Sequence, residues 1–101
     1  VEGIGSDVIT KAFLPNLVDE VITVSDKDSF SRARLVTQNE GISGGGSSGS
    51  VAYAMEQVAK SASEDSVIVG IFADAGIRYL SKCYNDNWMR KFGFLPHEKE
   101  V

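Results

Sequence analysis

The apolar run over residues 67–72 places the strongest constraint on how this chain folds. Its letters, VIVGIF, include several β-branched residues and no polar side chain. Such a run is typical of a β-strand covered on both faces, as strands of parallel sheets are. A chain that contains this strand needs helices on both sides of a sheet, which favours an α/β fold.

The preceding half of the chain contains a second predicted strand and a helix. Residues 18–24 are rich in β-branched side chains, which predicts a strand. Ser25 follows, with Asp28 three positions later, and this spacing is typical of a capping box at a helix start. We expect the helix to run from about residue 26 to 40, because Gly41 stands where a left-handed C-cap glycine belongs.

Two further helices complete the pattern. One is expected to start within or just after residues 47–50, because apolar side chains then recur at helical spacing and serine is a good N-cap. The other is expected over residues 74–94. The order strand, helix, helix, strand, helix predicts an α/β fold with a mainly parallel sheet and flanking helices.

Residues 41–50, GISGGGSSGS, allow three interpretations. Gly/Ser runs behave as flexible linkers, but each flank here is one helix that could not bury its apolar stripe alone. The stretch could instead be a tight turn that lets helices pack. It could also hold a ligand, because the free N–H groups of a helix start favour polar or anionic groups. The pattern alone leaves turn and ligand site open.

Composition excludes several classes of function. The chain has 101 residues and a formal net charge of -4, with no cluster of Lys and Arg, which argues against a nucleic-acid surface. Its apolar runs fall far short of the roughly 20 residues of a membrane span. The single cysteine, Cys83, excludes an internal disulfide and predicts a packing residue. We expect no metal site and a cytoplasmic location.

Three blocks of sequence carry a resemblance to a known family: VEGIG at 1–5, NEGI with GGSSGS at 39–50, and ADAGIRYLSK at 73–82. In order and spacing they resemble the C-terminal part of the catalytic domain in the cystathionine β-synthase and cysteine synthase family. These are pyridoxal-phosphate (PLP) enzymes of fold type II. The resemblance implies that residues 1–101 are a C-terminal fragment of such a domain, and that their sheet is part of its large domain.

The resemblance also implies residue roles. Ser47 would hydrogen-bond the pyridine nitrogen of PLP, with Gly46 beside it, and Asp74 would lie behind the ring and orient Ser47 or a water. A hydroxyl does not force that nitrogen to be protonated, which suits β-elimination. Asp74 could equally be a helix N-cap. Gly3, Ile4 and Gly5 match a substrate loop, or form a simple turn at a strand end.

The implied activity is a β-replacement. The family suggests that L-serine and homocysteine condense to cystathionine, as in transsulfuration, or alternatively that O-acetylserine and sulfide form cysteine. The Schiff-base lysine lies upstream of the matched blocks, so no catalytic residue is assigned and the chain alone is expected to be inactive. Expected partners are amino-acid substrates, the remainder of the catalytic domain and a second subunit in a homodimer.

A different class of function is also open. Ala73 and Ala75 stand where the family has proline and serine, and Ser6 replaces an aromatic residue. The departures at Ala73 and Ala75 support the alternative of a non-catalytic α/β binding or assembly module, whereas Ser6 argues against an aromatic substrate gate. Arg78 is expected to make a structural ion pair.

Overall fold

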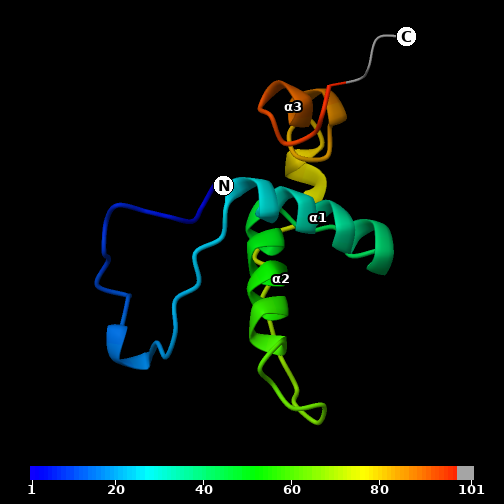
Figure 1. The fold of residues 1–101 in the computed structure, drawn as a ribbon. Coiled ribbons are helices and arrows are strands. Elements are labelled where there is room, and N and C mark those ends of the chain that lie inside the picture. The colour runs from blue at the N-terminus through cyan, green and yellow to red at the C-terminus, as the bar shows by residue number, and fades with distance from the viewer. Residues whose placement is uncertain (98–101) are drawn as a thin grey trace.

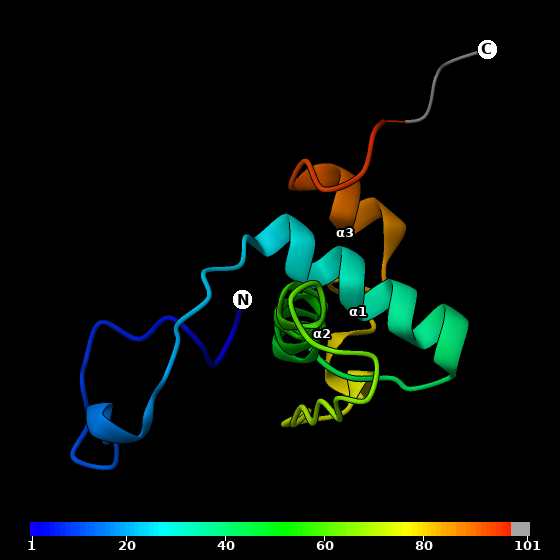
Figure 2. The ribbon, with the colours of Figure 1, turned by 60° about the horizontal axis from the view of Figure 1, so that its bottom comes forward.

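The computed structural model describes residues 1–97 and contains two long helices that pack against each other. Figure 1 shows α1 (Asp26–Glu40) lying across one end of α2 (Gly46–Ala59), with the N-terminal residues looping out to one side and α3 (Asp86–Lys91) lying beyond α1. Figure 2 shows that these N-terminal residues, which we call the N-terminal arm, stand away from both helices. The elements in chain order are the 3-10 helix η1 Pro15–Leu17, α1 Asp26–Glu40, α2 Gly46–Ala59, the 3-10 helix η2 Gly76–Tyr79 and α3 Asp86–Lys91.

The predicted α/β fold with a mainly parallel sheet, as part of the large domain of a fold type II enzyme, is wrong for this structure. No strand occurs within residues 1–97, and the single bridge there joins Gly44 to Ala75. Residues 18–24 and 67–72 form no ladder with each other or with any described segment. A strand exists only where a neighbour supplies backbone hydrogen bonds, and neither segment has such a neighbour.

Residues 67–72 nevertheless show the alternation of an extended segment. Val67, Val69 and Ile71 are 88%, 84% and 80% exposed, whereas the residues between them are partly buried. Gly70 lies so close to α2 that a Cβ there would be 2.3 Å from the sulfur of Met55. The run is therefore covered on one face, and not on both as predicted.

Helix α1 has the bounds that its local sequence predicts. The hydroxyl of Ser25 accepts a hydrogen bond from the Asp28 N–H at 3.1 Å and caps the first turn. At the other end, Gly41 has φ 68° and ψ 17°, the left-handed conformation that glycine adopts without strain. Both predictions are confirmed because each depends on residues within one turn of the helix end.

Helix α2 begins inside the glycine-rich stretch, so that stretch is not a flexible linker. The N-cap is Gly45 and no side chain caps it, so the expected serine cap is wrong. The glycines allow α1 to come close: a Cβ on Gly49 would lie 1.7 Å from the carbonyl oxygen of Ser29. The hydroxyls of Ser29 and Ser50 meet at 2.6 Å across the buried contact.

The helix predicted over residues 74–94 is broken into η2 and α3. The side chain of Asn85 accepts a hydrogen bond from the Trp88 N–H at 3.0 Å, so it starts a new helix. This arrangement places Trp88 against Phe30 of α1, with ring centroids 5.3 Å apart. Arg34 of α1 also pairs with Asp86 of α3.

Candidate functional site

A cavity of about 470 Å³ lies at the start of α2 and gathers most of the predicted site residues. Gly3 and Ile4 come from the N-terminal arm, Ser47 from the first turn of α2 and Asp74 from the segment before η2. Gly5 and Gly46 do not line this cavity. Its complete lining is Glu2, Gly3, Ile4, Ser47, Ala73, Asp74, Arg78 and Tyr79.

The helix start at this cavity has no side-chain cap at Gly45. The Ser48 N–H donates to the Gly45 carbonyl oxygen at 3.1 Å, whereas the N–H groups of the residues before it belong to the turn that an α-helix leaves without partners inside the helix. The positive end of the helix dipole adds to them. Ser47, two residues into this helix and partly exposed, therefore has its hydroxyl among groups that favour an acceptor or an anion.

Backbone hydrogen bonds join two loops beside this helix start. The Gly45 N–H donates to the carbonyl oxygen of Asp74 at 3.3 Å, and the Gly76 N–H donates to the carbonyl oxygen of Ser43 at 3.0 Å. Gly44 and Ala75 form the antiparallel bridge between these bonds. The bridge fixes the backbone of Asp74 against the N-cap of α2, although the two are about thirty residues apart in sequence.

The carboxylate of Asp74 is held on one side only. Its Oδ2 accepts a hydrogen bond from the hydroxyl of Tyr79 at 2.6 Å. Its Oδ1 is buried and has no hydrogen-bond partner within the described residues. A Cβ on Gly45 would lie 2.2 Å from that oxygen, so glycine is the residue that leaves room for it. A buried polar atom without a partner is costly, and this oxygen lies against Gly45 with almost no exposed surface.

Asp74 does not cap a helix. The N-cap of η2 is Ala75, and no side chain forms a cap there, so the alternative N-cap interpretation of Asp74 is wrong. Tyr79 was not singled out as a site residue in the sequence analysis. The hydrogen bond to Asp74, followed by partial desolvation, raises the pKa of Tyr79 above its ordinary value of 10.0. The hydroxyl therefore stays protonated as a donor.

The N-terminal loop needs its glycines for conformational reasons. Gly3 and Gly5 have φ values of 84° and 73°, which residues with a Cβ rarely adopt. The turn between them brings Ile4 to the cavity wall. Gly5 thus shapes the loop without lining the cavity.

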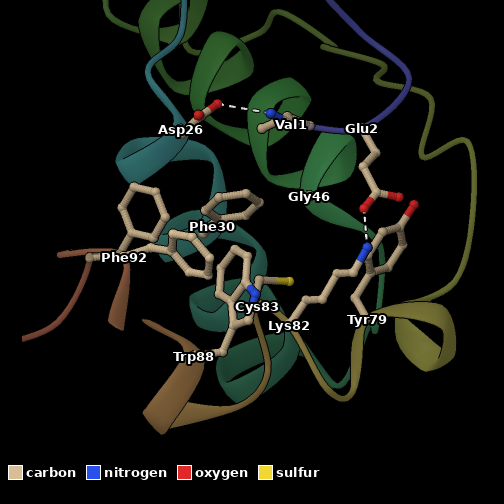
Figure 3. Close-up of a pocket in the computed structure, with 11 residues that line it drawn as sticks. Val1, Glu2, Asp26, Phe30, Gly46, Tyr79, Lys82, Cys83, Trp88 and Phe92 are labelled. Atoms are coloured by element: carbon tan, nitrogen blue, oxygen red, sulfur yellow. Dashed lines mark hydrogen bonds and ion pairs between the residues drawn. The ribbon is translucent and has the colours of Figure 1, made fainter. Parts of the chain in front are cut away.

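A second cavity of about 230 Å³ lies on the other side of Tyr79 and Glu2, which line both cavities. Figure 3 shows Phe30, Trp88 and Phe92 grouped on one side of it and Tyr79 with Lys82 on the other, where Lys82 pairs with Glu2. Gly46 lines this second cavity instead of the first, although it directly precedes Ser47 in α2.

Two further residues, Cys83 and Arg78, were expected to have structural roles. Cys83 is fully buried, and burial raises the pKa of its thiol, which confirms its prediction as a packing residue. Arg78 lines the larger cavity and forms no ion pair within residues 1–97, so its predicted ion pair is not found there. Within the same residues, no helix is long and apolar enough to cross a membrane.

Comparison with known proteins gives one consistent result. No protein-family model matches the chain. It is 38% identical over 95 residues to cystathionine beta-synthase of Apis mellifera, which covers 94% of this chain and 19% of that protein. It is 38% identical over 101 residues to the Mus musculus enzyme, covering 100% of this chain and 18% of that protein. It is 40% identical over 94 residues to the Saccharomyces cerevisiae enzyme, covering 90% of this chain and 18% of that protein.

These three relatives have the same name and similar sequence identities to this chain. The chain spans less than a fifth of the length of each. The similarity runs over the N-terminal loop, the glycine-rich helix start and the Asp74 segment alike. Over nearly its whole length, this chain is therefore homologous to cystathionine beta-synthases, of which it corresponds to a short segment.

Proposed function

We propose that this chain forms the pyridine-binding wall of the PLP site in a β-replacement enzyme of the cystathionine beta-synthase type. The cavity at the start of α2 is the observation that carries the proposal. It brings Gly3, Ser47 and Asp74 to one place from three distant parts of the sequence. The same three parts carry the resemblance to this family.

The groups at the cavity fit the pyridine end of PLP. Ser47 offers a neutral hydroxyl, which can hydrogen-bond a ring nitrogen in either protonation state. The carboxylate of Asp74, held by the Tyr79 hydroxyl, lies beside the helix start that carries Ser47. The turn at Gly3 places the side chains of Glu2 and Ile4 at the wall of this cavity, and Gly3 itself adds no side chain. No lysine of this chain is assigned a catalytic role.

PLP, when bound, supplies the electron sink for chemistry at the α-carbon of an amino acid. The contribution of this chain is to bind and orient the ring. A hydroxyl such as that of Ser47 would not force the ring nitrogen to be protonated, as a carboxylate partner would, and the weaker electron sink that results suits loss of a β-substituent. Gly3, which has no side chain, would leave room for the substrate at this wall.

The preferred substrates are L-serine and homocysteine, because the similar proteins are named cystathionine beta-synthases. O-acetylserine and sulfide are the alternative pair. The remainder of a PLP-dependent catalytic domain, a homodimer and a cytoplasmic location complete the proposal.

Replacement of Ser47 by alanine in the intact protein tests this function. The variant loses one hydrogen bond to the ring, so we expect PLP affinity and the β-replacement rate to fall about 10- to 100-fold. The absorbance band of bound PLP should also shift. Ser61→Ala, at an exposed position beyond the end of α2, is the matched control.

Unchanged affinity, absorbance and rate in Ser47→Ala would show that Ser47 is only a turn residue. An intact wild-type protein that binds no PLP would instead favour the non-catalytic module, for which Ala73 and Ala75 are the supporting residues.

A further inference from the structure

We propose that Tyr79 is a positioning residue of this site: its hydroxyl holds the carboxylate of Asp74 over the start of α2 and so fixes where Ser47 lies. The inference rests on the proposed function, which it deepens by adding a residue that the sequence comparison did not single out. Tyr79 acts through Asp74.

The first step is the contact between the two side chains. The Tyr79 hydroxyl donates to Asp74 Oδ2 at 2.6 Å, a short distance for a hydrogen bond to an ionised acceptor. Because one oxygen is held in this way, the rotation of the carboxylate is fixed. The other oxygen, Oδ1, then has only one place to lie.

The second step is the place of that oxygen. Oδ1 lies over Gly45, where an added Cβ would be 2.2 Å from it, and the Tyr79 ring would be 2.6 Å from the same Cβ. Gly45 is the N-cap of α2 and also donates its N–H to the Asp74 backbone. Tyr79 and Asp74 therefore close over the residue from which the first turn of α2, with Ser47, begins.

The third step is the charge. A carboxylate at the N-terminus of a helix interacts favourably with the helix dipole. Without the tyrosine hydroxyl, the Asp74 carboxylate would be free to rotate toward the first-turn N–H groups or toward the Ser47 hydroxyl. The tyrosine thus keeps the carboxylate from occupying the groups that a ligand needs.

The experiment uses Tyr79→Phe in the intact PLP-bound protein, because this change keeps the ring between the two cavities and removes only the hydroxyl. The readouts are the absorbance maximum of bound PLP and its dissociation constant. We expect a shift in the same direction as in Ser47→Ala, but smaller, and about 3- to 10-fold weaker binding. Tyr53→Phe is the matched control, because Tyr53 lies on α2 beside Arg32 and outside the site.

A double variant decides whether Tyr79 acts through Ser47. If it does, Tyr79→Phe combined with Ser47→Ala should bind PLP no more weakly than Ser47→Ala alone, because coupled residues are not additive. Fully additive losses would overturn the inference. So would a Tyr79→Phe variant that behaves like Tyr53→Phe while Ser47→Ala still shifts the band.

Amide hydrogen exchange over residues 45–48 separates the two proposals, because it does not depend on PLP. Faster exchange in Tyr79→Phe than in Tyr53→Phe supports the positioning role, and equal exchange overturns it. If Ser47→Ala changes neither absorbance nor affinity, the proposed function fails independently of this result.

Discussion

At the scale of single residues, the site depends on its glycines as much as on the residues that carry polar side chains. Gly45 leaves room for Asp74 Oδ1, and Gly3 adopts a backbone conformation that other residues rarely reach. Ser47 and Asp74 can share one cavity wall only because these positions are glycine. Ser47 then supplies a hydroxyl and Asp74 a carboxylate that Tyr79 holds, while Glu2 and Arg78 add two further charged groups to the wall.

The titration of Tyr79 provides a prediction at this scale. Its hydrogen bond to Asp74, its partial desolvation and the nearby negative charge raise its pKa above 10.0. The neutral hydroxyl makes this bond, so the stability that the bond contributes is fully present below pH 10 and is lost as the pH rises through the raised pKa.

Ultraviolet absorbance at high pH measures this titration among the three tyrosines of the chain. Tyr79→Phe should remove a component that titrates above pH 10, and Asp74→Asn should bring the pKa of Tyr79 closer to its ordinary value. A Tyr79 that titrates near pH 10 in the wild-type protein would contradict the hydrogen bond.

At the scale of elements, α1 and α2 define the framework that holds the site. Their contact is built from small residues, with Ser29 and Ala33 buried on α1 and Gly49 and Ser50 buried on α2. The close contact fixes α2, and with it the direction of the helix start at Ser47.

Gly49→Ala tests this packing. In an ordinary helix interior, glycine to alanine stabilises by about 0.5–1 kcal/mol. Here the new Cβ would lie 1.7 Å from the Ser29 carbonyl oxygen, a backbone atom that only a shift of the helices can relieve. We therefore expect the opposite sign, a loss of about 1–3 kcal/mol as in overpacked cores.

Urea unfolding of the intact protein measures the difference for Gly49→Ala. A variant as stable as the wild type, or more stable, would show that α1 and α2 are not in this close contact.

At the scale of the whole molecule, few apolar side chains are buried. Only Ala33, Cys83 and Met89 form the buried apolar core within the described residues, while Val67, Val69 and Ile71 stay exposed. The radius of gyration is 15.4 Å, against about 13 Å expected for a compact domain of 100 residues. The chain is thus open, with an apolar surface of the kind that usually contacts another protein surface.

We expect the 101-residue chain by itself to give no β-replacement. It has only one wall of the proposed PLP site and little core to hold that wall in place. Product formation from L-serine and homocysteine, with PLP added, measures this, and the intact protein is the positive control. Turnover by the pure chain above the protein-free rate would contradict the prediction.

Local sequence was sufficient wherever a structure depends on neighbours in the chain. The ends of α1 were predictable from Ser25 and Gly41, because capping contacts join residues within one turn. The turn at Gly3 was predictable for the same reason, because it too depends on residues close together in the sequence. The prediction of one helix over residues 74–94 was wrong for a local reason as well. Asn85 caps the start of α3, and the apolar pattern did not reveal this capping role.

The sequence by itself determined which residues favour helix, turn or extended backbone, and its resemblance identified Ser47 and Asp74 as a candidate pair. Only the tertiary structure decided that residues 67–72 lie extended on α2 without pairing, and that Tyr79 reaches Asp74 beside Gly45. The physical reason is the distance along the sequence over which each kind of interaction acts. Backbone preferences and caps act over a few residues, whereas strand pairing and a cavity wall require contacts between distant segments, which no local pattern specifies.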